Sequence, residues 1–121
     1  MTRIGLVIDD DIPSRKIYAS LLRSLGFEVT EAGDGVEAMA VLQNGQPRIV
    51  FLDIRLPKVD GLQILHYIYD SAHLSDTRVF IITAHKDYAD TISLRNGDMY
   101  LLKPIAPSEI RDIVSQALIQ P

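Results

Sequence analysis

Arg48-Ile49-Val50-Phe51-Leu52-Asp53 is the stretch of sequence that decides the fold. Its apolar run is too short for a helix of its own, and a short run bounded by turn residues is typical of a strand buried on both faces, as in a parallel sheet. The run ends at Asp53 and is followed by Pro57 and by Asp60-Gly61. Because ligands bind at the carboxyl ends of the strands in open α/β sheets, we expect Asp53 to lie at a binding edge.

Three other apolar runs also end in polar residues. They are residues 4–8 before Asp9-Asp10-Asp11, residues 79–82 before Thr83, and residues 99–102 before Lys103-Pro104. If all four runs are parallel strands, then carboxylates, a hydroxyl group and an ammonium group gather at one edge of the sheet.

Helical patterns separate the strands. Pro13 marks the start of a first helix and Gly26 its end. Asp34 with Glu37 three residues later predicts a capping box for a second helix that ends at Gly45. A third helix is expected over residues 62–72, a weakly patterned one around Ile92 and Leu94, and a last one after Pro104. The residues expected to face the core are Ile17, Leu21, Leu22 and Leu25; Val36, Met39, Ala40 and Leu42; Leu62, Leu65, Ile68 and Tyr69; and Ile110, Ile113, Val114, Ala117 and Leu118.

The alternation of strands and helices predicts the fold class. Strands and helices alternate five times, and right-handed crossovers then give a single α/β domain over residues 1–121, with a doubly wound parallel sheet and helices on both faces. Residues 27–32 form the least apolar of the expected strands, which suits an edge. The flavodoxin-like (βα)5 order 2-1-3-4-5 is therefore favoured, and it brings the aspartates together at the switch point.

Composition limits the function classes. The chain has 121 residues, of which 47% are hydrophobic and 23% are charged, as expected for one soluble globular domain. A net charge of −4 argues against direct nucleic-acid binding. The absence of cysteine excludes disulfides and thiolate chemistry and agrees with a cytoplasmic protein. Neither a long apolar segment nor a signal-peptide pattern is present, so we expect no membrane association.

The acidic cluster indicates a particular chemistry. Like-charged carboxylates at Asp9, Asp10 and Asp53 are tolerable together only if a cation lies among them. Oxygen ligands suit Mg²⁺, which commonly shares a phosphate oxygen. An aspartate can also be the nucleophile of phosphoryl transfer and form an acyl phosphate. Lys103 would then stabilise the charge of the transferred group, and Thr83 could hydrogen-bond one of its oxygens.

The chain resembles the receiver domains of two-component response regulators over essentially its whole length. The motifs that carry the resemblance are Val7-Ile8-Asp9-Asp10-Asp11, Leu52-Asp53-Ile54-Arg55-Leu56-Pro57 with Asp60-Gly61, Thr83-Ala84, and Tyr100-Leu101-Leu102-Lys103-Pro104. Each motif alone is weakly specific. Their order, at the ends of successive expected strands, makes the combination highly specific.

The resemblance implies residue roles and partners. Asp53 would accept a phosphoryl group from a phosphohistidine on a sensor histidine kinase or a histidine phosphotransfer protein. Asp10, Asp53 and the backbone carbonyl of Arg55 would bind Mg²⁺ directly, and Asp9 would bind it through water. Lys103 would pair with the phosphoryl group, and its bond to the following proline would be cis.

The resemblance also implies a conformational switch. Thr83 would move toward the phosphoryl oxygens, and the aromatic side chain of Tyr100 would turn inward into the vacated space. The phosphoryl group can bias such an equilibrium only by binding one of the two states better. The output would reach a downstream effector protein or an attached output domain.

The chain departs from the family pattern in two ways. Thr83 and Lys103 are 20 residues apart, closer than is common in receivers, so the fourth helix or its loops must be shortened. A weak or phosphorylation-dependent homodimer through that region stays open, but the usual dimer should not be assumed. In the family, the positions of Arg55 and His85 influence hydrolysis of the acyl phosphate, and we expect Arg55 to shield the phosphoryl group from water.

Three alternatives remain. A haloacid-dehalogenase-type phosphatase would need an acid at the position of Arg55. A flavin-binding electron carrier is disfavoured because the carboxylates would repel the FMN phosphate. A degenerate receiver that acts as a phosphorylation-independent interaction module is opposed by the complete set of acids, Thr83 and Lys103. The chain contains no output domain, and the sequence does not say whether it acts alone or belongs to a longer polypeptide.

Overall fold

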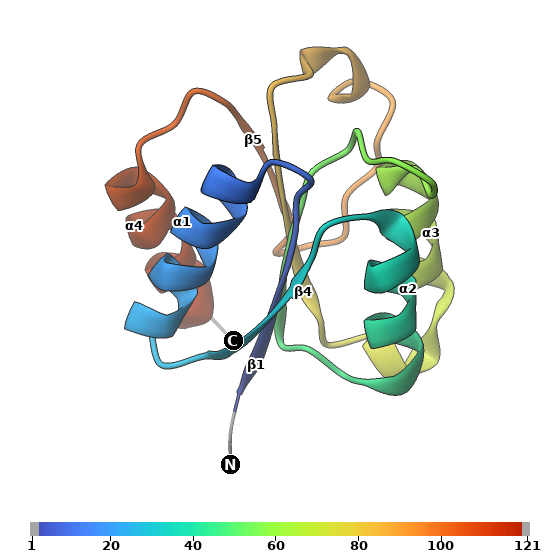
Figure 1. Ribbon diagram of the computed structural model, residues 1–121, viewed down its shortest axis with the longest axis horizontal. Helices are drawn as coiled ribbons and strands as arrows, with labels where there is room; N and C mark the ends of the chain where they lie inside the picture. Colours follow the sequence, from blue (N-terminus) through green and yellow to red (C-terminus); the bar gives the residue numbers. More distant parts are fainter. Residues whose placement is uncertain (1–2, 120–121) are drawn as a thin grey trace.

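The apolar runs form the centre of one five-stranded parallel sheet, seen in a computed structural model that describes residues 3–119 (Figure 1). The strands are β1 (Ile4–Ile8), β2 (Glu28–Ala32), β3 (Ile49–Leu52), β4 (Arg78–Thr83) and β5 (Met99–Leu102). Their order is β2-β1-β3-β4-β5, which confirms the predicted order and places β2 at an edge. All neighbouring pairs are parallel, so every strand ends on the same side of the molecule.

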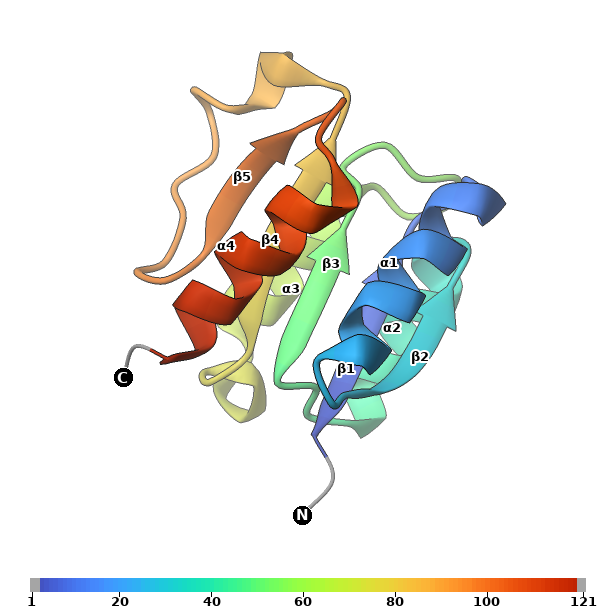
Figure 2. The same cartoon turned by 90° about the vertical axis from the view of Figure 1, so that its left-hand side faces the viewer.

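Two pairs of helices cover the two faces of the sheet. Helices α1 (Ile12–Ser24) and α4 (Pro107–Ile119) lie on one face, and α2 (Gly35–Asn44) and α3 (Gly61–Asp70) lie on the other (Figures 1 and 2). Alternate strand residues point to opposite faces, so each face has its own core. Phe51 packs edge to face between Tyr18 and Phe80, with ring centroids 5.9 Å apart in both pairs. Leu52 packs into the other core, beneath α2 and α3.

The helix ends follow the polar residues of the sequence. Asp11 caps α1 by accepting a hydrogen bond from the backbone N–H of Ser14, 3.0 Å away. Gly26 follows α1 with a φ of 93°, a conformation that suits glycine. Asp34 accepts from the N–H of Glu37, but the Glu37 carboxylate accepts from Gly33 rather than from Asp34, so the expected capping box is incomplete.

The predicted helix faces need three corrections. Ile17 and Val36 are 47% and 53% exposed, and Ala40 is also exposed. Helix α1 instead turns Tyr18 and Ala19 toward the sheet, and α2 buries Gly35, Ala38 and Leu42. Both helices carry apolar residues on adjacent stripes, and spacing alone does not tell which stripe packs against the strands.

The fourth predicted helix is wrong. Residues 84–98, which the structure describes throughout, contain no α-helix, so four α-helices alternate with the five strands. A short 3-10 turn over Lys86–Tyr88 is followed by an irregular segment that leads to a turn at Gly97, where φ is 95°. The few apolar residues of this segment cannot bury a full helical face. Two side chains hold the segment instead: Arg95 donates a hydrogen bond to the Thr77 carbonyl, and Asp98 accepts one from the Val79 N–H.

Within residues 3–119, no helix has both the length and the apolar character that a membrane span requires.

Candidate functional site at the carboxyl edge of the sheet

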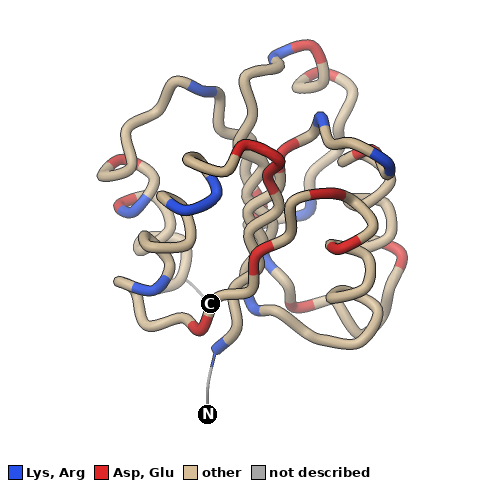
Figure 3. The backbone as a smooth tube through the Cα atoms, viewed as in Figure 1, with Lys and Arg blue, Asp and Glu red and all other residues tan. Residues whose placement is uncertain are grey.

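The ends of β1 and β3 bring the aspartates together. The Asp9 N–H donates to the carbonyl of Ala32, and the Asp53 N–H donates to the carbonyl of Ile8, at 3.1 and 3.0 Å. The sheet ladder therefore continues through both acidic residues and fixes their backbones. Carboxylate oxygens of Asp9, Asp10 and Asp53 lie within 4.8 Å of one another. Acidic residues mark the turn from β1 into α1 in Figure 3.

Lys103 reaches into this cluster from the end of β5. Its ammonium lies 3.2 Å from Asp9 Oδ2 and 3.7 Å from Asp53 Oδ2. Its backbone N–H donates to the carbonyl of Thr83 at 2.8 Å, and its bond to Pro104 is cis, as expected. Burial disfavours the charged ammonium, but the carboxylates of Asp9 and Asp53 outweigh this and raise the pKa of Lys103. Lys103 is therefore a fixed cation beside two carboxylates.

The three carboxylates differ in their surroundings. Asp9 is 2% exposed, Asp53 is partly exposed and Asp10 is exposed. Burial raises the pKa of Asp9, although the N–H of Asp11, which donates to Asp9 Oδ1 at 2.9 Å, and the charge of Lys103 act in the opposite direction. The cluster thus combines one buried acid with two that solvent can reach.

This donor set fits Mg²⁺. Its atoms are all carboxylate oxygens, they lie close enough to share one ion, and the exposed side of the cluster leaves room for water ligands. Asp53 Oδ1 also lies 3.4 Å from the N–H of Arg55, so the carboxylate is oriented by the loop that follows it. These residues could therefore hold a hard divalent cation beside a nucleophilic oxygen.

A second group of polar contacts starts at Thr83. Its side chain is fully buried, and its hydroxyl accepts a hydrogen bond from the His85 N–H at 3.3 Å. The carbonyl of His85 in turn accepts a hydrogen bond from the Tyr100 hydroxyl. Burial raises the pKa of Tyr100. A chain of contacts therefore links the end of β4 to the side chain in β5 that is expected to move.

Arg55 lies at the mouth of the site. Its side chain is exposed and lines a hollow together with Asp10, Leu56, Pro57, Asp60 and Tyr88. The structure therefore places Arg55 beside one of the acidic residues. His85 is half-buried in the loop after β4.

Sequence reasoning missed Tyr18 and Arg15. The Tyr18 ring lies under the ammonium of Lys103, with 5.6 Å between Nζ and the ring centroid. Arg15 donates from Nη1 to the backbone carbonyl of Asp9 at 3.1 Å. Both residues lie on the first turns of α1, directly after the acidic turn, and that proximity was the available signal.

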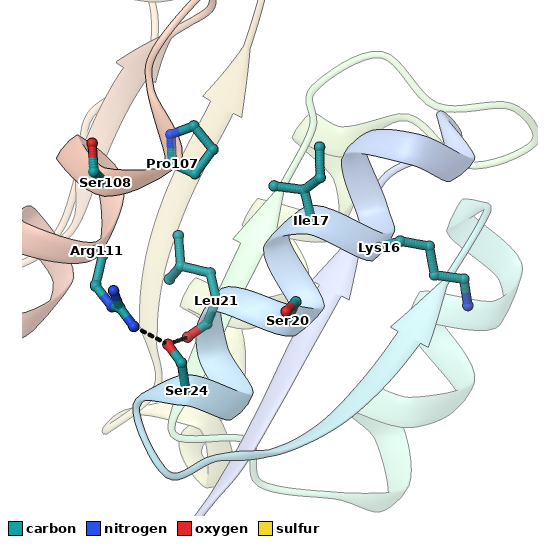
Figure 4. Close-up of a pocket in the computed structure, with 8 residues that line it drawn as sticks. All are labelled: Lys16, Ile17, Ser20, Leu21, Ser24, Pro107, Ser108 and Arg111. Carbon is teal, nitrogen blue, oxygen red and sulfur yellow. Dashed lines mark hydrogen bonds between the residues drawn. The ribbon is translucent and has the colours of Figure 1, made fainter.

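Another hollow lies away from the acidic cluster. It runs between α1 and α4 and is lined by Lys16, Ile17, Ser20, Leu21, Ser24, Pro107, Ser108 and Arg111 (Figure 4). Arg111 Nη2 donates to the hydroxyl of Ser24 at 3.0 Å and so joins the two helices. This hollow contains none of the carboxylates and has no part in their chemistry.

The sequence is similar to those of several known proteins. Residues 6–115 match the family model of the response regulator receiver domain. The probable transcriptional regulator ycf27 of Cyanophora paradoxa is 38% identical over 87% of this chain and 44% of its own length. The polar-differentiation response regulator DivK of Brucella ovis is 28% identical over 88% of both chains. The chain thus spans less than half the length of the ycf27 protein and most of the length of DivK.

Solved structures show the same fold. The response regulator TrrA of Thermotoga maritima, in complex with Mg²⁺-BeF, is 27% identical, with a TM-score of 0.82 over 96% of this chain and 99% of that one. A CheY-like receiver domain from Methanospirillum hungatei has a TM-score of 0.84 at 23% identity, over 98% of this chain and 95% of that one.

Proposed function

The chain belongs to the response regulator receiver domains of two-component systems, and on that premise we propose that it accepts a phosphoryl group on Asp53 and signals by a change of conformation. The observation that carries the proposal is the meeting of Asp9, Asp10, Asp53 and Lys103 at one edge of the sheet. The proposed domain covers residues 1–121, and we place it in the cytoplasm.

Asp53 is the proposed nucleophile. A carboxylate oxygen attacks the phosphorus of a phosphohistidine, the P–N bond breaks, and an acyl phosphate forms while the histidine nitrogen keeps the electron pair and takes up a proton. The partly exposed position of Asp53 leaves its carboxylate open to a donor. The donor is a sensor histidine kinase or a histidine phosphotransfer protein.

Charge compensation comes from fixed cations. A Mg²⁺ ion held by Asp9, Asp10, Asp53 and the Arg55 carbonyl would supply a Lewis acid for the phosphoryl oxygens. Lys103, already within reach of Asp53, pairs with another of these oxygens. Because its ammonium is held by Asp9 before transfer, little reorganisation is needed when negative charge develops. Arg55, exposed at the mouth of the site, shields the acyl phosphate from water, and His85 modulates its lifetime.

The proposed switch uses Thr83 and Tyr100. To donate a hydrogen bond to a phosphoryl oxygen, the Thr83 hydroxyl would move toward it, and this movement would draw its oxygen away from the His85 N–H. Any shift of His85 would change its hydrogen bond with Tyr100, because the Tyr100 hydroxyl donates to the His85 carbonyl. The altered surface then acts on an effector protein or an attached output domain, without direct nucleic-acid or membrane contact by the receiver.

Phosphorylation by a small donor tests this function. The chain is incubated with Mg²⁺ and acetyl phosphate and weighed by mass spectrometry, and we expect the mass of one phosphoryl group to be added. Asp53→Asn should abolish the addition. Asp11→Asn is the matched control because Asp11 is an exposed helix cap in the neighbouring turn, and it should leave the addition intact.

The alternative is a degenerate receiver that binds its partner without phosphorylation. Under that alternative, neither the wild type nor the Asp11→Asn variant gains mass, with or without Mg²⁺. A gain that persists in Asp53→Asn would instead show that another residue accepts the group, and it would contradict the proposal.

A further inference from the structure

The carbonyl of Asp9 belongs to the peptide that joins Asp9 to Asp10 in the β1–α1 turn. Arg15 donates to this oxygen from Nη1 at 3.1 Å, and its Nε donates to Glu31 Oε1 at the same distance. The Arg15 and Glu31 side chains are only 16% and 18% exposed. Arg15 is therefore a fixed link between strand β2 and the acidic turn.

The peptides on both sides of Asp9 are thus held by β2. The Asp9 N–H donates to the Ala32 carbonyl, and the Asp9 carbonyl accepts from Arg15, which is anchored on Glu31. The peptide that follows Asp9 carries Asp10, whose side chain is exposed. Rotation of that peptide would turn the Asp10 carboxylate away from its two neighbours, and the hydrogen bond from Arg15 opposes this rotation.

We propose that Arg15 is a positioning residue for the cation site, because it orients the Asp9–Asp10 peptide and so holds the Asp10 carboxylate beside Asp9 and Asp53. The inference rests on the proposed function, in which these acids bind Mg²⁺. Groups that orient metal ligands from behind typically change metal affinity about 10- to 100-fold when they are removed.

Charge alone predicts the opposite effect. Arg15 is a cation near a cation site, so its removal should strengthen Mg²⁺ binding if it acts only through its charge. If Arg15 acts as a positioning residue, its removal should weaken Mg²⁺ binding. The sign of the change therefore separates the two roles.

Lys16 provides a matched control. It pairs with the same carboxylate, Glu31, at 3.2 Å, but it is 62% exposed. Its removal deletes one positive charge from the same ion-pair cluster and leaves the hydrogen bond between Arg15 and Asp9 in place. Solvent and salt screen such an exposed charge.

Gly33 offers a second, independent perturbation. A Cβ at this position would lie 2.9 Å from Arg15 Nη1, the mobile end of a long side chain. Gly33→Ala should therefore displace the guanidinium group while its charge and its aliphatic part remain. It tests the hydrogen bond rather than the charge.

The experiment measures Mg²⁺ affinity by isothermal titration calorimetry on the whole chain. We expect the Kd of Arg15→Ala to rise about 10-fold, that of Gly33→Ala to rise in the same direction, and that of Lys16→Ala to stay within about twofold of wild type. Thermal unfolding in chelator and hydrogen exchange of the Asp10 amide are measured in parallel. Faster exchange at Asp10 with a cooperative thermal transition in chelator supports positioning.

Unchanged or tighter binding by Arg15→Ala overturns the inference, and so does an equal loss in Lys16→Ala. If Arg15→Ala does not fold, the result for Gly33→Ala is used instead. The inference is then overturned if Gly33→Ala binds Mg²⁺ as tightly as the wild type does. A wild-type chain that binds no Mg²⁺ would contradict both the proposed function and this inference. If the wild type binds Mg²⁺ and Arg15→Ala binds it with the same Kd, only the inference about Arg15 is contradicted.

Discussion

Individual residues at the carboxyl edge are held by backbone groups more than by one another. Three side chains accept a hydrogen bond from a backbone N–H two residues later in the chain. The pairs are Asp9 with Asp11, Asp53 with Arg55, and Thr83 with His85. Each contact joins a side chain to the second residue after it, so β1, β3 and β4 each pass into a tight turn at the site. The placement of each carboxylate then depends on the residues that let these turns pack closely.

Gly61 is one such residue. A Cβ there would overlap the carbonyl oxygen of Ile54 and lie 2.6 Å from the carbonyl oxygen of Asp53. Both are backbone atoms that cannot move cheaply. Gly61→Ala should therefore lower the free energy of unfolding by about 2 kcal/mol, measured by urea denaturation, and slow phosphorylation by acetyl phosphate.

Gly45→Ala is the control for this change. Its Cβ would meet a single carbonyl, that of Val41, at 3.1 Å, far from the acidic cluster. We expect a loss below about 1 kcal/mol and an unaltered phosphorylation rate. Equal effects of the two substitutions would mean that close packing at Gly61 does not control the site.

Among the elements, the segment between β4 and β5 differs most from expectation. Its anchors are Arg95 and Asp98. Arg95 Nη2 donates to the Thr77 carbonyl at 2.6 Å, and its guanidinium carbon lies 4.4 Å from the centroid of the Tyr69 ring. Asp98 accepts from the Val79 N–H at 2.9 Å and from the Tyr69 hydroxyl at 2.7 Å. These contacts tie the segment to α3 and to the start of β4.

Removing the Asp98 carboxylate should loosen this segment. Its side chain is 3% exposed, and Asp98→Ala leaves the Val79 N–H and the Tyr69 hydroxyl without this acceptor. We expect the free energy of unfolding to fall by about 3 kcal/mol, with faster hydrogen exchange over residues 89–98. Asp90→Ala, at an exposed position in the same segment, should change neither quantity appreciably. Equal losses in both variants would contradict the assigned role of Asp98.

Tyr69 makes the same anchor sensitive to high pH. Burial is the main cause that raises its pKa to about 12, above the ordinary value of 10.0. The folded state therefore holds the phenolic proton more tightly than the unfolded state. The stability gained in this way is fully present below pH 10 and is lost as the pH rises toward 12.

The comparison of wild type with Tyr69→Phe isolates this effect. The difference in their free energies of unfolding should be constant near neutral pH and shrink above pH 10, where the wild-type phenol begins to ionise on unfolding. Urea denaturation at a series of pH values measures the difference. A constant difference up to pH 12 would show that Tyr69 has an ordinary pKa in the folded protein.

The sequence predicts some elements better than others. The four apolar runs could be read directly, because a strand buried on both faces has no polar residue to blur its pattern. The ends of those runs also located Asp53 and Lys103. The anchor at Arg95 and Asp98 could not be read, since two opposite charges three residues apart look the same in a solvated turn and in a buried clamp. Arg15 escaped notice for a related reason, because its partner Glu31 lies in another strand.

At the scale of the whole molecule, the burial of Asp9 opposes folding. Asp9 is buried next to two other acids, and burial raises its pKa, so the carboxylate form is stabilised less in the folded chain than in water. Core packing on both faces of the sheet offsets this cost. A bound divalent cation would turn the same cluster into a source of stability.

Addition of Mg²⁺ should therefore stabilise the chain. At a concentration about tenfold above its Kd, one bound ion adds about 1.4 kcal/mol to the free energy of unfolding. Thermal unfolding in Mg²⁺ and in chelator measures the gain. Asp10→Asn should lose most of it, whereas Asp11→Asn, whose side chain caps α1, should keep it. A gain retained in Asp10→Asn would show that the ion binds elsewhere.

The charge of Lys103 would affect which metal ions bind to the acidic cluster. One ammonium among three carboxylates leaves a formal double negative charge, which a single alkaline-earth ion neutralises and a sodium or potassium ion does not. If the cluster binds a cation, the lysine would thus favour a divalent ion. Without its charge, electroneutrality would call for a trivalent ion, and lanthanides would become the better match.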